Sequence, residues 1–215
     1  MSKHFDRLRN EHKDFDFNKS DEDFGSDPID AFKKWFDDAC NANETEPNAF
    51  CLSTADVNSL QPSSRILYLK DLRNQELVFY TNYESEKGKQ IEGNSNVSML
   101  FFWPEMQRQV RIQGKAYKIS NEESDFYFKT RPRSSQVGAW ASNQSQLLDS
   151  SAELKERVEA IEIKFPGDIP RPDFWGGYAV KAELFEFWQG KPSRLHDRLI
   201  FKLENGKWKS FRKNP

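Results

Sequence analysis

Cysteine and histidine are both scarce in this chain. Its 215 residues include two cysteines, Cys40 and Cys51, and three histidines, at positions 4, 12 and 196. Two cysteines cannot build a disulfide framework, and neither belongs to a C-x-x-C pair. The histidines are scattered too widely to suggest a zinc site. We therefore expect a protein of a reducing compartment, the cytoplasm, with no metal site.

Long apolar runs are also missing. No stretch approaches the roughly 20 apolar residues that a transmembrane helix needs. The first residues, MSKHFDR, lack the apolar core of a signal peptide. The 32 Lys and Arg nearly balance the 34 Asp and Glu, so the formal net charge of −2 provides no overall field for nucleic acid. We expect neither a membrane nor a nucleic-acid partner, although a local basic pocket is compatible with this balance.

Aromatic residues, by contrast, are plentiful. The chain has 18 Phe and six Trp, and its length suits one sizeable core. Residues 1–25 are highly charged, and such a segment cannot bury much apolar surface alone. The sequence therefore predicts a mobile arm over residues 1–25 and a single domain over residues 26–215.

Capping patterns and short apolar runs predict an α+β fold. Asp27 before Pro28 predicts a helix start. One face of that helix would carry Ile29, Phe32, Phe36, Ala39 and Cys40. Ser120 and Ser150 each precede acidic residues, as helix N-caps do. Runs of branched and aromatic residues predict strands over 49–54, 64–70, 76–82, 97–103 and 108–119. Asn205-Gly206 predicts a hairpin between residues 199–203 and 208–211. Antiparallel strands with inserted helices favour a barrel-like α+β domain.

Two segments combine cations with hydroxyl groups. Arg65 and Lys70 lie on opposite faces if their strand is regular, and spacing alone favours solvated strand ends over two anion sites. Tyr127 and Arg131 are four residues apart, hence on one side of a helix that Pro132 must end nearby. With Ser135 they suit a phosphate cradle, because Arg can bind phosphate with two hydrogen bonds. The alternative is a helix C-terminus whose cations favour its dipole.

The densest group of functional side chains lies near the C-terminus, in the sequences FWQG at 187–190 and RLHDR at 194–198. It combines two guanidiniums, an imidazole, a carboxylate and an indole N–H. Such groups bind phosphates and planar rings. A lone His beside charges is ordinarily a surface residue, so the function of this segment depends on the rest of the chain.

Taken together, these motifs resemble the pyridoxine/pyridoxamine 5′-phosphate oxidases, FMN enzymes that make pyridoxal phosphate. Matching segments run from Arg65 to Arg198. They comprise the Arg-x-x-x-x-Lys strand at 65–70, Tyr-Thr-Asn at 80–82, Tyr-Phe-x-x-Arg-Pro-Arg-x-Ser-Gln at 127–136, Gly-Ala-Trp…Gln-Ser at 138–145 and the C-terminal signature. The resemblance implies an FMN-binding split β-barrel, antiparallel and Greek-key-like with peripheral helices, and a homodimer with FMN at its interface.

The resemblance also implies roles for individual residues. The expected FMN-binding residues are Arg65, Ile66, Leu67, Tyr68, Leu69, Lys70, Tyr80, Thr81, Lys87, Gln109, Gln144, Ser145, Trp188 and Arg198. The expected substrate-binding residues are Lys70, Tyr127, Arg131, Ser135, Arg194, Leu195 and His196. Arg194 and His196 are also the expected catalytic residues. Arg9 is the nearest match to a family lid element, with His12 where the family has Tyr. Phe174-Trp175-Gly176-Gly177 also recurs in the family, and we interpret it as a structural turn.

One position departs from the family pattern. The family commonly has Arg-Lys where this chain has Glu86-Lys87. A carboxylate beside the FMN phosphate would be repulsive, so we expect Glu86 to turn outward and FMN affinity to depend more on Arg65 and Lys87.

The implied activity is oxidation of pyridoxine or pyridoxamine 5′-phosphate to pyridoxal 5′-phosphate, with hydride transfer to FMN and reoxidation by O2 to give H2O2. One alternative is a split-barrel flavin oxidase with another substrate, as in the phenazine pathway, which should lack part of the Lys70, Tyr127, Arg131 and Ser135 set. A non-catalytic flavin-binding protein, the other alternative, should lack the Arg194-Leu195-His196 contacts. This chain has both sets. It has no Gly-x-Gly-x-x-Gly or Walker sequence, so no Rossmann or P-loop site is expected.

Overall fold

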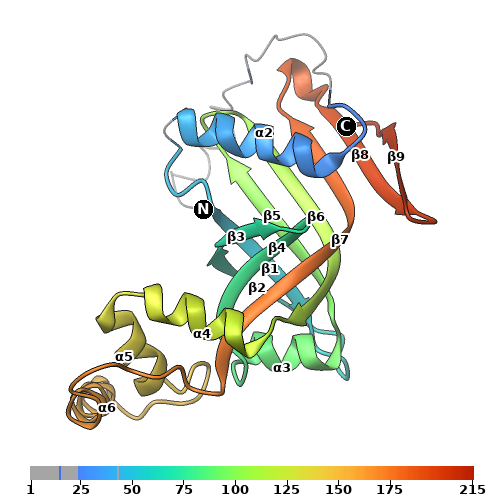
Figure 1. The fold of residues 1–215 in the computed structure, drawn as a ribbon. Coiled ribbons are helices and arrows are strands. Elements are labelled where there is room, and N and C mark those ends of the chain that lie inside the picture. The colour runs from blue at the N-terminus through green and yellow to red at the C-terminus, as the bar shows by residue number, and fades with distance from the viewer. Residues whose placement is uncertain (1–14, 16–23, 43) are drawn as a thin grey trace, which may run out of the picture. The chain divides into compact units, whose positions relative to one another are not determined.

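The computed structural model describes residues 15, 24–42 and 44–215, which form two compact units (Figure 1). The first unit comprises the described residues up to Pro47 together with Leu100–Ile112 and Leu184–Pro215. The second comprises Asn48–Met99 and Gln113–Glu183. Most of the predicted arm lies outside the described residues, and the single domain over 26–215 stays a prediction.

Strands and helices alternate irregularly along the chain, as the α+β prediction requires. In the described part of the chain, nine strands form one sheet in the order β2-β1-β5-β6-β7-β4-β3, with β8 pairing with β7 and β9 with β8. Their bounds are β1 (Ala49–Ala55), β2 (Pro62–Tyr68), β3 (Asp71–Arg73), β4 (Glu76–Asn82), β5 (Asn96–Trp103), β6 (Arg108–Lys118), β7 (Trp175–Gln189), β8 (Asp197–Glu204) and β9 (Lys207–Arg212). The β1–β2, β3–β4, β4–β7, β7–β8 and β8–β9 pairs are antiparallel.

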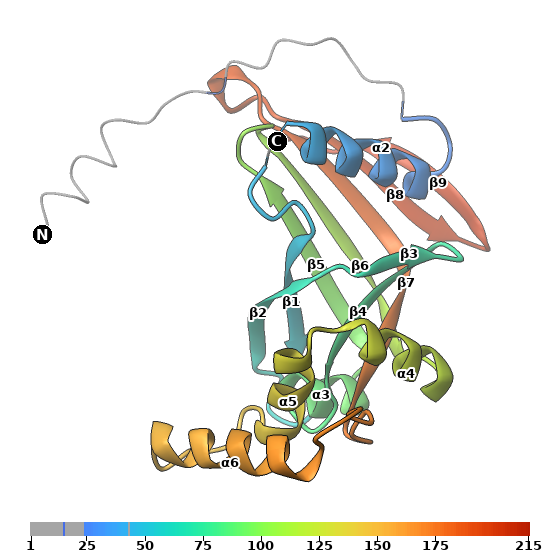
Figure 2. The same cartoon turned by 60° about the vertical axis from the view of Figure 1, so that its left-hand side comes forward.

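Helix α2 (Pro28–Asn41), which is blue in Figure 2, contributes buried apolar side chains to the core of the first unit. Asp27 caps it as predicted, its Oδ1 accepting a hydrogen bond from the Ile29 N–H at 2.8 Å. Phe32 contacts Phe101, with ring centroids 5.1 Å apart. The prediction for Cys40 is wrong, because this residue is exposed. The buried face runs instead through Ile29, Phe32, Trp35 and Ala39, which leaves Cys40 beyond its edge.

The C-terminal hairpin is confirmed. Asn205 and Gly206 have φ values of 52° and 75°, which a two-residue type I′ turn requires of both central residues. Glu204 therefore pairs with Lys207, and the register continues along β8 and β9.

The chain changes partner strand just after β2. This strand ends at Tyr68, where the Leu69 N–H binds the carbonyl of Asn48 and the next N–H, of Lys70, binds that of Val78. The short strand β3, which was not predicted, follows on β4. The argument that Arg65 and Lys70 lie on opposite faces therefore fails, since Lys70 is not part of a regular β2.

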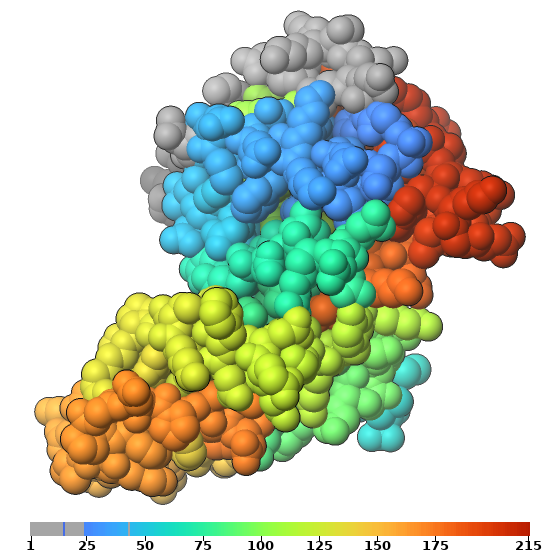
Figure 3. Space-filling model, in the orientation of Figure 1, coloured from blue at the N-terminus to red at the C-terminus, as the bar shows by residue number. Residues whose placement is uncertain are grey.

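Four helices belong to the second unit: α3 (Glu86–Gly93), α4 (Asn121–Thr130), α5 (Arg133–Ala141) and α6 (Ser151–Lys164). Ser120 caps α4 in a capping box with Glu123, and Ser150 caps α6. Helices α3 and α5 were not predicted. Helix α4 stops before Pro132, so Arg131 is extended, with ψ of 146°, rather than helical. Helices α5 and α6 lie together in the yellow and orange region of Figure 3.

The expected turn at Gly176-Gly177 is wrong. Both glycines lie inside β7, where other groups approach the backbone closely. A Cβ on Gly176 would lie 2.1 Å from the hydroxyl oxygen of Tyr83, and one on Gly177 would lie 2.4 Å from Cδ1 of Ile119. The glycines therefore permit close packing rather than a turn.

None of the helices in the described residues is long and apolar enough to cross a membrane. In the same residues, no group of three or more His, Cys, Asp and Glu side chains is arranged to hold a metal ion.

Candidate functional site

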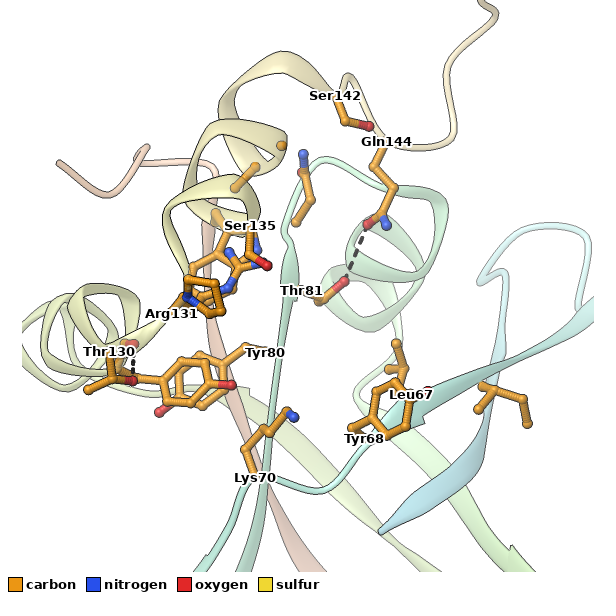
Figure 4. Close-up of a pocket in the computed structure, with 17 residues that line it drawn as sticks. Leu67, Tyr68, Lys70, Tyr80, Thr81, Thr130, Arg131, Ser135, Ser142 and Gln144 are labelled. Atoms are coloured by element: carbon orange, nitrogen blue, oxygen red, sulfur yellow. Dashed lines mark hydrogen bonds between the residues drawn. The ribbon is translucent and has the colours of Figure 1, made fainter. Parts of the chain in front are cut away.

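A cavity of about 660 Å³ opens in the second unit (Figure 4). The four predicted substrate-phosphate ligands, Lys70, Tyr127, Arg131 and Ser135, all line it. They come from the segment between β2 and β3, from α4 and the residue that follows it, and from α5. No Asp or Glu occurs among the described residues that line the cavity. Its two cations therefore favour an anion.

Seven of the predicted FMN-binding residues line the same cavity: Ile66, Leu67, Tyr68, Lys70, Tyr80, Thr81 and Gln144. Thr81 Oγ1 donates a hydrogen bond to Gln144 Oε1 at 3.4 Å, as Figure 4 shows. Ser145 is exposed and Leu69 is buried, and neither lines the cavity. Arg65 and Lys87 also do not line the cavity, but Lys87 Nζ donates a hydrogen bond to Gln144, which does.

Arg131 is prepared for an anionic ligand. Its guanidinium carbon lies 4.4 Å from the centroid of the Trp175 ring. Its Nη1 is buried without a hydrogen-bond partner among the described residues. Burial lowers the pKa of Arg131, and Tyr127 opposes that change. A buried donor without an acceptor is costly, and a phosphate oxygen would remove that cost.

Aromatic rings form one wall of the cavity. Tyr80 stacks on Tyr127 with centroids 3.8 Å apart, and Trp175 stacks on Tyr80 at 5.5 Å. Burial raises the pKa of Tyr80 to about 12, so its phenol remains a neutral donor near pH 7. Trp175 was interpreted only as part of a turn. Its position against Arg131 could not be found from sequence, because β7 and the end of α4 meet only through the tertiary fold.

Lys87 is a buried cation beside the cavity. Its residue is only 6% exposed, and its Nζ donates to Ser85 Oγ at 3.2 Å and Gln144 Oε1 at 3.1 Å. Burial, followed by the nearby charge of Arg65, lowers the pKa of Lys87 to about 8, while Glu86 acts in the opposite direction. A buried ammonium that contacts only neutral oxygens is suited to bind an anion.

Glu86 is exposed, as expected of an outward-turned carboxylate. Its Oε1 accepts a hydrogen bond from Gln90 Nε2 at 3.2 Å, one helical turn further along α3. The carboxylate is therefore held on the helix surface.

The first unit carries a second group of predicted residues. Gln109, Trp188 and Arg198 line a cavity of about 310 Å³ together with Arg111 and Glu186. Glu186 Oε1 accepts from Arg198 Nε at 2.8 Å, and Oε2 pairs with Arg111. Burial favours the neutral carboxyl, but the hydrogen bond from Arg198 and the charge of Arg111 outweigh it and lower the pKa of Glu186. Arg198 is thus fixed by a buried carboxylate that sequence reasoning missed.

His196 lies against Trp188, with ring centroids 4.6 Å apart, and Phe15 contacts both rings edge-on. His196 Nδ1 accepts from the Lys191 N–H at 3.2 Å, so the neutral ring carries its proton on Nε2. Arg194 precedes it in an exposed turn, with φ of 62°. Such left-handed conformations in residues other than glycine store strain and are often functional.

The other predicted residues of this segment are also located. Leu195 is 70% exposed beside the same turn. Asp197 pairs with Arg212 at 2.9 Å. Arg9 lies outside the described residues. The predicted residues therefore fall into two groups, one in each unit.

Comparison with known proteins shows the family. Residues 36–165 match the family model described as pyridoxamine 5′-phosphate oxidase, and residues 175–215 match the pyridoxine 5′-phosphate oxidase C-terminal dimerisation region. The chain belongs to the pyridoxine/pyridoxamine 5′-phosphate oxidase family. The resemblance inferred from the motifs is confirmed.

Relatives in this oxidase family match along most of their length. The chain is 49% identical over 190 residues to the pyridoxine/pyridoxamine 5′-phosphate oxidase of Actinobacillus pleuropneumoniae serotype 3 (strain JL03), covering 88% of this chain and 90% of the relative. It is 48% identical over 197 residues to that of Leptospira biflexa serovar Patoc (strain Patoc 1 / Ames), covering 91% and 92%.

Solved structures confirm the predicted fold class, the split β-barrel of this oxidase family. PhzG from Burkholderia lata 383, in complex with tetrahydrophenazine-1-carboxylic acid, matches with a TM-score of 0.85 and 28% identity, covering 90% of this chain and 95% of PhzG. An oxidase-related, FMN-binding protein from Nostoc punctiforme PCC 73102 matches with a TM-score of 0.69, covering 86% and 97%. At 16% identity, this second likeness shows the fold alone.

Proposed function

We propose that this protein is an FMN-dependent oxidase that converts pyridoxine 5′-phosphate or pyridoxamine 5′-phosphate to pyridoxal 5′-phosphate in the cytoplasm. The observation that carries the proposal is the cavity of the second unit. It gathers Lys70, Tyr127, Arg131 and Ser135 and has no carboxylate among its described lining residues. Relatives of that name that are 48–49% identical over about nine-tenths of the chain support the same activity.

The substrate phosphate is held by charge and hydrogen bonds together. Arg131 supplies a guanidinium whose buried Nη1 needs an acceptor, and Lys70 supplies a second positive charge. The hydroxyl groups of Tyr127 and Ser135 are placed to complete the cradle. Two cations balance a dianionic phosphate, so this site selects phosphorylated substrates.

FMN is held beside this site by neutral donors and two further cations. Lys87 and Arg65 bind its phosphate, and Gln144, Thr81 and the residues of β2 hold the rest of the molecule. The family resemblance adds Gln109, Trp188 and Arg198. Bound FMN would supply the redox chemistry, in which C4′ of the substrate loses a hydride equivalent and O2 is reduced to H2O2; with pyridoxamine 5′-phosphate, water would then hydrolyse the imine and release ammonia.

The two groups of residues have different tasks. In the first unit, Arg194 and His196 orient the substrate ring and stabilise its changing charge. The match of residues 175–215 to a dimerisation region supports a homodimer. We propose that FMN lies at the interface of that dimer, as the resemblance implies.

The direct test is to purify the protein, record its flavin spectrum and add pyridoxine 5′-phosphate under air. We expect a yellow protein that forms pyridoxal 5′-phosphate and H2O2 in equal amounts. A colourless protein that cannot be reconstituted with FMN would sink the proposal. Arg194→Ala should lower kcat/KM far more than FMN retention, and unchanged steady-state turnover would refute the role of Arg194.

A split-barrel oxidase for a phenazine-type substrate is the second candidate, favoured by the 0.85 TM-score to PhzG. The phosphate cradle argues against it, because a substrate without phosphate would leave Arg131 Nη1 unpaired. The identity to PhzG is also lower, at 28% against 48–49% for the oxidases. A yellow protein that turns over no phosphorylated pyridine would favour this candidate.

A further inference from the structure

A line of polar side chains in the second unit connects Arg65 on β2 to Glu86 on α3. Arg65 Nη1 donates to Thr54 Oγ1 at 2.6 Å. Thr54 Oγ1 donates to Gln90 Oε1 at 2.5 Å, and Gln90 Nε2 donates to Glu86 Oε1 at 3.2 Å. Thr54 and Gln90 are buried, with 3% and 8% of their surfaces exposed. The interior of the line is therefore shielded from water.

The direction of every hydrogen bond in this line follows from its chemistry. A guanidinium has no acceptor, so the Thr54 oxygen accepts from Arg65 and its proton is left for Gln90. The carbonyl oxygen of Gln90 then faces Thr54, and its amide nitrogen faces the Glu86 carboxylate. All donors point toward Glu86, so the line runs from a positive to a negative group. The opposite charges at its two ends strengthen the hydrogen bonds of such a line.

Arg65 is held by Thr54 and also by Ser63, whose Oγ accepts a hydrogen bond from Arg65 Nη2, and its neighbour Lys87 is also positive. Its bonds from Nη1 to the carbonyls of Leu52 and Ser63 are long, at 3.4 and 3.3 Å. Its charge acts on Lys87 and helps, after burial, to lower the pKa of that lysine. An arginine has many rotamers, and fixing its guanidinium in advance removes part of the ordering cost of binding an anion.

We propose that Thr54 and Gln90, with Glu86 at the far end, are positioning residues that hold Arg65 beside Lys87 to receive the phosphate of FMN. This inference rests on the proposed function, in which Arg65 and Lys87 bind FMN. It gives a role to Glu86, which was expected only to turn outward from the phosphate. The negative charge lies at the exposed end of this line of hydrogen bonds, and two buried side chains, Thr54 and Gln90, connect it to Arg65.

The first test replaces Thr54 by Val, which keeps the shape of the side chain but removes one acceptor for Arg65. FMN and riboflavin, which lacks the phosphate, are titrated into the flavin-depleted full chain, and quenching of flavin fluorescence gives each Kd. Thr54→Val should raise the Kd for FMN roughly tenfold, as expected for one hydrogen bond from a charged group. The Kd for riboflavin should not change. Thr54→Ser should restore FMN binding to within about twofold of the wild type.

Ser53→Ala is the matched control. Ser53 is adjacent to Thr54 on β1, and its side chain points to the other face of the strand. Its hydroxyl forms a hydrogen bond with Ser64 Oγ at 2.9 Å and takes no part in the line from Arg65 to Glu86. This variant removes a hydroxyl from the same strand, and the partner of that hydroxyl, Ser64, directly precedes Arg65 in the sequence. It should leave the Kd of both flavins unchanged.

Glu86→Gln provides a second variant, because Thr54→Val leaves a buried Gln90 oxygen without its donor and can weaken folding. Glu86 is exposed, and the new amide can still accept from Gln90. We expect Glu86→Gln to raise the Kd for FMN about twofold in the wild type and to have no effect in the Thr54→Val background.

Three results would overturn the inference: equal shifts for FMN and riboflavin, additive effects in the double variant, or tighter FMN binding by Glu86→Gln in the wild type. If Thr54→Val does not fold, Glu86→Gln alone decides through the sign of its effect. The proposed function fails separately, if the wild type itself binds no FMN. If the wild type and Thr54→Val bind FMN with the same Kd, only the positioning role is rejected.

Discussion

The two groups of predicted site residues differ in whether a carboxylate lies beside their cations. In the first unit, Arg198 and Arg111 share the buried Glu186. In the second unit, the cavity that contains Lys70 and Arg131 has no carboxylate among its described lining residues. In the first unit one carboxylate offsets part of the charge of two arginines, whereas the described lining of the second cavity offers its cations no carboxylate.

This difference separates two kinds of arginine that look alike in the sequence. An arginine paired with a buried carboxylate is a rigid hydrogen-bond donor that brings little net charge. An arginine without such a partner, such as Arg131, contributes its full charge to an anion. We therefore expect phosphate recognition to depend on the second unit, and the orientation of planar rings to depend on the first.

The largest effect should come from removing the unpaired guanidinium. Arg131→Met should raise the KM for pyridoxine 5′-phosphate roughly 100-fold, since hydrogen bonds to a charged phosphate contribute about 1.5–3 kcal/mol each. Steady-state kinetics gives the value. Arg133→Met is the control, because Arg133 donates to the carbonyls of Gly167 and Phe165 instead of lining the cavity. An equal rise in KM for both variants would contradict the comparison.

In the first unit, the corresponding change should affect stability first. Glu186→Gln leaves Arg198 and Arg111 partly buried without their shared charge, and we expect a loss of about 2 kcal/mol in the free energy of unfolding. Chemical denaturation of the FMN-loaded protein measures it. Glu204→Gln, which removes a surface partner of Lys209, should leave the free energy of unfolding nearly unchanged. A Glu186→Gln variant as stable as the wild type would show that this carboxylate does not fix the arginines.

The smallest effect is a pH dependence set by Lys87. Its pKa of about 8 means that the free protein loses this charge above pH 8, whereas a bound phosphate favours the protonated form. The Kd for FMN should therefore be constant from about pH 7 to 7.5 and rise about tenfold by pH 9. Lys87→Met should bind weakly without this dependence, and Lys89→Met, which changes an exposed lysine on the same helix, should keep it. A flat profile in the wild type would contradict this role of Lys87.

The lowered pKa of Lys87 also affects the protein without FMN. Between pH 8 and 10.5 the unfolded chain binds a proton that the folded chain has released. The contribution of Lys87 to the free energy of unfolding therefore rises with pH in that window. Pairing with a phosphate at pH 7 would reduce the cost of holding the charged form buried.

Local patterns in the sequence predicted much of the fold. The Asp27 cap, the capping box at Ser120 and the Asn205-Gly206 turn depend on neighbouring residues, so the structure reproduces them. The end of β2 and the role of Gly176-Gly177 depend on contacts with strands distant in the sequence. Those features were predicted wrongly, since no local sequence pattern shows which distant strand or side chain approaches a given stretch of backbone.

The candidate site shows the same division. Motifs located Lys70, Tyr127, Arg131 and Ser135, and the fold places all four around one cavity. Trp175 beneath Arg131 and Glu186 between two arginines were missed, because each acts on a residue far away in the sequence. The line from Arg65 to Glu86 was missed for the same reason, and Thr54 has no sequence signal of its own.

We propose that the cavity of the second unit, which has no carboxylate among its described lining residues, recognises a phosphate on a pyridine substrate. The most direct test is to measure kcat/KM for pyridoxine 5′-phosphate and for pyridoxine with the FMN-loaded protein under air. We predict that the phosphorylated substrate is preferred by roughly 10³-fold or more, as several charge-assisted hydrogen bonds would give, and that Arg131→Met removes most of that preference. Equal values for the two substrates, or a preference that survives Arg131→Met, would contradict the account.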